Sequence, residues 1–118
     1  MKKDLTERLL KFAIDVILLL RKINNSEEYL IIKRQLIKSS TSAGANYEEA
    51  QGGSSKADFT NKTRIALKEM RESNFWLKVI NGTITQDNLN SECETLIKES
   101  QELKNILGAI CVKTQRKH

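Results

Sequence analysis

The sequence contains no proline and few aromatic residues, and both absences restrict the fold. Without proline, no ring interrupts a long helix, and collagen-like or PxxP architectures are excluded. Aromatic residues make up 5% of the 118 residues, so a core must be built mostly from Leu, Ile, Val and Ala. A chain of this length suits one domain, residues 1–118, which buries a core without disulfides or metal. The composition predicts an all-α protein.

Histidine is almost absent, which bears on metal sites. The single histidine, His118, is the last residue of the sequence. Ferritin-like bundles bind two metal ions through glutamates combined with Glu-x-x-His pairs from two helices. The glutamates that invite this comparison are Glu48, Glu49, Glu69 and Glu72. Since they lack the histidines, we expect no metal site and no cofactor, and we interpret these glutamates as hydrogen-bonding or ion-pairing groups.

The sequence has two cysteines, Cys93 and Cys111, both in what reads as one helix. Their separation along that helix is about 27 Å, so they cannot form a disulfide within it. We expect both to be reduced core residues of a cytosolic protein. Neither has a histidine to activate it as a nucleophile. No catalytic residue and no small-molecule substrate are predicted, and we expect the protein not to be an enzyme.

The sequence also lacks a long hydrophobic run. The most apolar stretch, Ile14–Leu20, contains Asp15 and is far shorter than the ~20 residues of a membrane-spanning helix. Lys2 and Lys3 precede it as in a signal peptide, but the small-residue cleavage site is missing. We therefore expect a cytoplasmic protein that does not bind membranes.

Apolar residues recur with a spacing of three to four in four blocks, which is the periodicity of amphipathic helices. The blocks run from Leu5 to Ile23, from Ser26 to Gly52-Gly53, from Ser54-Ser55 to Asn81-Gly82, and from near Thr85 or Asp87 to Ile110. Ser26 is a good N-cap, and two glutamates follow it in the first turn. Long helices joined by short turns pack antiparallel. The sequence therefore predicts an antiparallel up-down-up-down four-helix bundle.

The first block is apolar on nearly every side, although one stripe is enough for a bundle core. The residues that point partly away from that stripe are Ile14, Ile17, Leu18 and Leu20. One interpretation is a wide stripe that packs on two neighbouring helices. The other, which we favour, is an interface between subunits.

The second block contains seven short side chains in succession, from Ser39 to Ala45. Such a run lowers helix propensity, and the close approach of another helix would compensate for it. If the second and third helices pair about the Gly52–Ser55 turn, Glu69 lies opposite Ser39 and Ser40. A carboxylate that accepts hydroxyl hydrogen bonds there would be a satisfied polar node.

The net charge is +5, and the basic excess is unevenly distributed. Residues 56–78 carry six basic and three acidic side chains, whereas residues 87–104 carry two basic and five acidic ones. A polarised basic surface suits phosphate binding, although a solvated charged face explains it equally well. The candidate nucleic-acid-binding residues are Lys56, Lys62, Arg64, Lys68, Arg71, Lys113, Arg116 and Lys117. No aromatic platform accompanies them, because we interpret Phe59, Phe75 and Trp76 as structural.

Two central segments resemble a known family. Residues 35–50, QLIKSSTSAGANYEEA, are similar to the second-helix signature of the bacterial four-helix bundle family. Its members are also called 23S rRNA intervening-sequence proteins, and they include accessory proteins of diversity-generating retroelements. Residues 55–59, 65–73 and 76–77 continue the resemblance, which spans almost the whole chain. At positions 43–44 the chain has Ala43-Gly44, whereas many members have a small residue followed by a bulkier apolar one.

The resemblance implies a homopentameric ring whose basic surfaces bind nucleic acid, and in the retroelement branch a reverse transcriptase partner. Asn46, Glu49 and Glu69 match recurring positions and join Ser39 and Ser42 in the expected polar node. Our leading hypothesis is a non-enzymatic homopentamer that binds structured RNA or DNA through phosphate contacts. The alternative is a protein-interaction scaffold, such as a reverse transcriptase accessory subunit.

Overall fold

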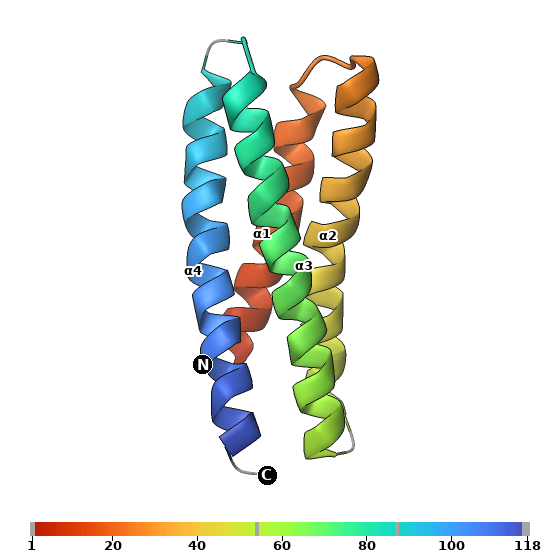
Figure 1. The fold of residues 1–118 in the computed structure, drawn as a ribbon, viewed down its shortest axis with the longest axis vertical. Coiled ribbons are helices and arrows are strands. Elements are labelled where there is room, and N and C mark those ends of the chain that lie inside the picture. The colour runs from red at the N-terminus through yellow and green to blue at the C-terminus, as the bar shows by residue number, and fades with distance from the viewer. Residues whose placement is uncertain (1, 54, 87, 117–118) are drawn as a thin grey trace.

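Four helices account for most of the chain. The computed structural model describes residues 2–53, 55–86 and 88–116. The helices are α1 (Lys2–Arg21), α2 (Glu27–Gln51), α3 (Lys56–Thr83) and α4 (Leu89–Arg116). Figure 1 shows that consecutive helices run in opposite directions along a bundle of 48 × 21 × 20 Å. The predicted up-down-up-down four-helix bundle is confirmed.

Serine caps begin two of the helices, and short polar side chains explain where these helices start. The hydroxyl of Ser26 accepts a hydrogen bond from the backbone N–H three residues later, at 3.2 Å, and the hydroxyl of Ser55 does the same at 3.0 Å. Each satisfies a backbone donor that the first helical turn leaves free. The N–H of Gly52 bonds back to the carbonyl of Glu49 at 3.1 Å, where α2 ends. The predicted ends of the α2–α3 turn are confirmed.

The turn between α3 and α4 lies later in the chain than the residue pattern predicts. Helix α3 continues one residue past the predicted end at 81–82. Helix α4 begins at Leu89, so the predicted start near Thr85 is wrong, and the alternative, Asp87, lies outside the described residues. Asn88 adopts a left-handed conformation, with φ of 75°. Asparagine tolerates this conformation better than most residues, so the chain reverses its direction there.

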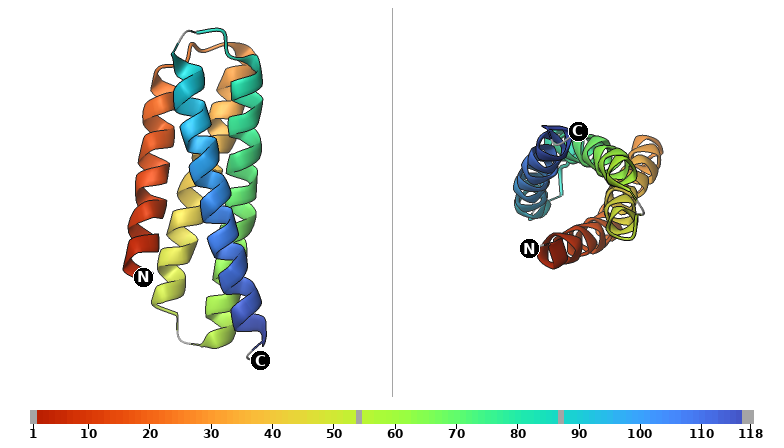
Figure 2. Two further views of the ribbon diagram at one scale, coloured as in Figure 1. Left: turned by 90° about the vertical axis from the view of Figure 1, so that its left-hand side faces the viewer. Right: turned by 90° about the horizontal axis from the view of Figure 1, so that it is seen from below.

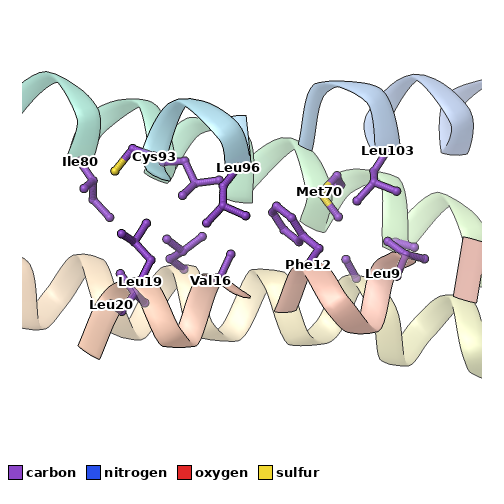
Figure 3. Close-up of a cluster of buried hydrophobic side chains, with 14 of the residues drawn as sticks. Leu9, Phe12, Val16, Leu19, Leu20, Met70, Ile80, Cys93, Leu96 and Leu103 are labelled. Carbon is purple, nitrogen blue, oxygen red and sulfur yellow. The ribbon is translucent and has the colours of Figure 1, made fainter. Parts of the chain in front are cut away.

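The helices bury the stripes that their periodicity predicts. Each stripe is lined by Leu, Ile, Val, Ala and a few larger side chains, and Figure 3 shows part of the resulting core. Phe12 points from α1 toward Met70 of α3 and Leu96 of α4. Three of the predicted stripe residues, Tyr29, Phe59 and Ile110, are only partly buried, and Thr60 and Cys111 are buried next to the last two. Both cysteines are free and buried, as predicted, and burial raises the pKa of the Cys93 thiol to about 11.

Each helix contacts its two neighbours around the bundle. The contacting pairs are α1 with α2, α2 with α3, α3 with α4, and α1 with α4. Seen along the long axis, the helices follow one another in chain order (Figure 2). The outer seam between α1 and α2 therefore lies across the bundle from the outer seam between α3 and α4. We call these two surfaces the α1–α2 face and the α3–α4 face.

Small side chains line the contact between α2 and α3. The hydroxyls of Ser39 and Ser73 share a hydrogen bond of 2.8 Å in the interior, and the hydroxyl of Ser73 also donates to the backbone carbonyl of Glu69 at 3.1 Å. Ser39 therefore lies opposite Ser73 and not opposite Glu69, so the predicted register is wrong by about one helical turn. Ser39 and Ser73 are both buried and face each other in the observed register, whereas the prediction assumed symmetry about the turn.

The structure consequently divides the predicted polar node into separate contacts. The side-chain amide of Asn46 donates to the hydroxyl and the carbonyl of Ser42, at 3.1 and 2.9 Å, within α2. Glu49 lies 3.6 Å from the ammonium of Lys62 on α3. Burial and the neighbouring Glu72 raise the pKa of Glu69, while nearby lysines lower it. The five residues therefore do not assemble around one carboxylate.

Candidate nucleic-acid interface

Four basic side chains form a line on the solvent-exposed side of α3. Arg64, Lys68, Arg71 and Lys78 are separated by four, three and seven residues, so they recur on one side of the helix. All four are exposed. They span about 21 Å along the helix axis. We call these four residues the α3 basic row; Lys78 was not among the predicted binding residues.

The cations of the α3 basic row have no carboxylate partners among the described residues. No Asp or Glu oxygen of that part of the chain lies within 4.0 Å of them. Arg64 makes one hydrogen bond, to the side-chain oxygen of Asn61 at 3.3 Å. Arg8 on α1 shows the contrast, because its guanidinium contacts both Glu99 and Glu102 at 2.8 Å. The row is therefore available to an external anion.

The row borders α4, so it belongs to the α3–α4 face. Asn74 lies three residues after Arg71 and four before Lys78, and its side-chain amide donates to the hydroxyl of Ser100 on α4 at 2.8 Å. In keeping with this, burial raises the pKa of the Cys111 thiol of α4, and the charges of Arg64 and Arg71 lower it. Lys104 lies two turns before Cys111 on the same side of α4 and adds a fifth cation to this face. Sequence reasoning missed Lys104 because residues 87–104 are acidic overall.

Lys62, a predicted binding residue, is engaged within the protein. Its ammonium lies 3.6 Å from a carboxylate oxygen of Glu49 and 3.6 Å from one of Asp58. It faces α2, away from the α3–α4 face. Pairing with two carboxylates lowers its value as a phosphate contact, so we remove it from the candidate interface.

The other predicted cations lie apart from the row. Lys113 is exposed on α4 and follows Ile106 by two helical turns and Glu99 by four. Glu99 binds Arg8 of α1. It therefore lies on the α1 side of α4. Lys56 is exposed at the first residue of α3. Arg116 ends α4, but its side chain and all of Lys117 lie outside the described residues.

One aromatic side chain lies within the row, contrary to the prediction that it is structural. Phe75 is 57% exposed and follows Lys68 by two helical turns. Its ring contacts the ring of Trp76 edge to face, with centroids 5.1 Å apart and an interplanar angle of 76°. Trp76 itself is partly buried against the core. In the sequence, the spacing of seven residues between Lys68 and Phe75 indicates that both side chains lie on the same side of the helix.

Apolar side chains are exposed on the α1–α2 face. Ile14 and Leu18, predicted interface residues, are 47% and 46% exposed, and Ile17 is half-buried. Leu20 is 2% exposed and packs in the core, so its prediction as an interface residue is wrong. Leu10, which sequence reasoning missed, is the most exposed of the large apolar side chains of α1, at 60%.

A groove of about 380 Å³ lies between α1 and α4. Its lining combines Phe12 and Leu96 with side chains of both charges, among them Lys11, Asp15 and Glu102.

Within the described residues, no group of three or more His, Cys, Asp or Glu side chains is placed to hold a metal ion. In the described part of the chain, no helical segment combines the length and the hydrophobicity that a membrane-spanning helix requires.

The sequence profile of the 23S rRNA-intervening sequence proteins matches residues 2–109. The chain belongs to this family. A crystal structure from the S23 ribosomal protein family, of a Bacteroides thetaiotaomicron protein with unknown function, is similar to the structure of this chain. The two share 33% sequence identity and a TM-score of 0.79, over 91% of this chain and 97% of the other. No functionally curated protein matches. Family membership therefore accounts for the fold of this chain but does not assign a function, and the evidence for a function comes from the side chains on its surface.

Proposed function

We propose that this member of the family is a non-enzymatic protein that binds RNA or DNA through phosphate contacts on its α3–α4 face. The observation that carries the proposal is the α3 basic row, in which four exposed cations have no carboxylate within 4.0 Å among the described residues. A nucleic-acid backbone carries one negative charge per phosphate and releases counterions when such cations bind it. Because α3 is a continuous helix, it holds these cations in a fixed line.

Binding is expected to fall steeply with salt. Three to four phosphate contacts give a slope of about −3 in a plot of log affinity against log salt concentration. Between 50 and 200 mM salt, the affinity for a fluorescein-labelled 20-nucleotide RNA hairpin should fall about 60-fold by fluorescence anisotropy. A slope near zero, or an absence of binding at 50 mM salt, would contradict the proposal.

The proposal includes assembly of several copies through the α1–α2 face. Leu10, Ile14 and Leu18 are spaced by four residues and lie on the outside of α1. Ile37 of α2 is also exposed on its outer side. Helices α1 and α2 approach each other closely beside these side chains. Gly44 of α2 has no Cβ atom, and one added there would lie 3.6 Å from the Cβ of Leu9 on α1. An apolar surface of this kind suits a subunit contact, and the family resemblance suggests five copies.

Light scattering tests this assembly. The protein is expected to have the mass of five 13.5-kDa chains, and the variant with Ile14→Glu and Leu18→Glu should have the mass of one. Ile65→Glu is the matched control, since Ile65 is exposed on α3, and it should leave the mass unchanged. A wild-type mass of one chain would contradict the assembly.

The same exposed apolar side chains support a second candidate function, a scaffold for another protein such as a reverse transcriptase. Large exposed apolar side chains also occur on α2, at Leu30 and Ile31. The two candidates differ in their requirement for the cations of α3. A complex with a purified reverse transcriptase that survives 500 mM salt, together with an absence of RNA binding at 50 mM salt, would favour the scaffold.

A further inference from the structure

Phe75 is an exposed aromatic side chain, and the cations beside it on α3 have no carboxylate within 4.0 Å among the described residues. Arg71 precedes it by four residues and Lys78 follows it by three, spacings that bring Cβ atoms within about 6 Å on a helix. More than half of the Phe75 side chain remains in contact with solvent. Core packing therefore does not explain a phenylalanine at this position.

The contact with Trp76 holds the Phe75 ring without covering it. The two rings meet edge to face at 5.1 Å, a preferred geometry for aromatic pairs. Trp76 is partly buried against the core, so it forms a supported base for the more exposed ring. This arrangement orients the Phe75 side chain before any ligand arrives, which reduces the entropy cost of binding.

The charges around Phe75 favour an anionic ligand. Glu72 precedes Phe75 by three residues and is the one acidic residue of α3 at helical contact spacing from it, whereas Lys68, Arg71 and Lys78 lie on the same side of the helix as Phe75. The part of α3 around Phe75 therefore carries three positive charges and one negative charge. A ligand that matches this surface combines a planar ring with negative charges on either side of it.

We infer that the α3 basic row binds single-stranded nucleic acid, with an unpaired base stacked on Phe75 and neighbouring phosphates on Arg71 and Lys78. This inference rests on the proposed function and adds the class of ligand. A duplex keeps its bases stacked inside, whereas a single strand or a loop offers a free base face to an aromatic ring. Arg71 and Lys78 are about 10 Å apart along the helix and lie on either side of Phe75, so both reach the backbone of one bound segment.

Anisotropy with two labelled RNAs of equal length tests the inference. The wild-type protein should bind 12-nucleotide oligouridine more tightly than a 12-base-pair duplex. Phe75→Ala should weaken oligouridine binding between about 5-fold and about 150-fold, the range observed for loss of one base stack, and should leave duplex binding unchanged. Phe75→Leu should weaken it comparably, because leucine is apolar but has no ring. Phe75→Tyr should restore it, and Ile65→Ala is the matched control for an exposed apolar side chain of α3.

Trp76 provides an independent readout, because it is the single tryptophan of the chain and its ring contacts Phe75. Unlabelled oligouridine should change Trp76 fluorescence in saturable fashion in the wild-type protein. The duplex should change it much less. Circular dichroism of Phe75→Ala should match that of the wild type, since the side chain is largely outside the core.

The possible failures are distinguishable. If Phe75→Ala binds oligouridine like the wild type, while glutamates in the α3 basic row abolish binding, the inference is overturned and the proposed function stands. If Phe75→Ala instead lowers the solution mass without affecting RNA affinity, Phe75 belongs to a contact between copies, and the inference is equally overturned. If the wild-type protein binds neither RNA at 50 mM salt, both the inference and the proposed function fail.

Discussion

The variant in which Arg64, Lys68 and Arg71 are all replaced by glutamate is expected to bind nucleic acid on the order of 1000-fold more weakly than the wild type. Each charge-assisted hydrogen bond to a phosphate contributes about 1.5 kcal/mol, and the loss of three gives this factor before any repulsion from the new carboxylates. The helix should tolerate the change, because all three side chains are exposed and make no ion pair in the described part of the chain. Fluorescence anisotropy at 50 mM salt measures the loss.

A second triple variant distinguishes binding at a specific site from attraction by the net charge of the whole protein. Lys11, Lys98 and Lys113 are exposed on the side where α1 and α4 meet, outside both the α3–α4 face and the α1–α2 face, and their replacement by glutamate changes the net charge by the same amount. We expect this control to weaken binding by less than about 10-fold, through long-range electrostatics that salt screens. Equal losses in the two variants would show that net charge, and not the row on α3, is responsible for binding.

Phe12→Ala is expected to produce the largest loss of stability of any single substitution discussed here, about 3–5 kcal/mol in the free energy of unfolding. Phe12 is 1% exposed and packs between α1 and the helices α3 and α4 (Figure 3). Removing its ring deletes buried apolar surface and leaves a cavity in the middle of the bundle. The loss is measured by urea unfolding at one fixed protein concentration, because self-association stabilises the folded state by mass action.

Phe75→Ala is the matched control, since it removes the same atoms from a side chain that is 57% exposed. This substitution should lower the free energy of unfolding by less than about 1 kcal/mol, which is the contribution of one aromatic contact such as that with Trp76. Similar costs at positions 12 and 75 would contradict the packing of α1 described above. The comparison also establishes that Phe75→Ala folds, which the binding experiments require.

Much of the fold could be predicted because the responsible signals are local. The spacing of apolar residues predicted which side of each helix is buried, and Leu36, Met70 and Leu103 are fully buried as expected. The caps at Ser26 and Ser55 were predictable for the same reason, since a capping hydroxyl bonds a backbone N–H three residues away. The beginning of α4 was missed because the left-handed turn at Asn88 has no comparably specific signal.

The candidate site was predicted only in part because it depends on contacts between helices. Arg64, Lys68 and Arg71 were correctly grouped by their spacing on one helix. Lys62 lies only two residues before Arg64, yet it pairs with Glu49 of α2, and this partner depends on the register between α2 and α3. A register error of one turn moves every side-chain partner by about 5 Å along the axis, so charge pairing could not be inferred from symmetry about the turn.

The sequence by itself determined the number of helices, most of their ends and the identity of their buried stripes, because these follow from interactions between residues three or four positions apart. The tertiary structure alone decided that Phe75 is exposed, that Leu20 is buried and that, over the residues the structure describes, no carboxylate lies within 4.0 Å of the cations of the α3 basic row. These properties depend on how wide the buried side of each helix is and on the register between neighbouring helices. Both are set by packing against two neighbouring helices at once, and no pattern within a single helix records them.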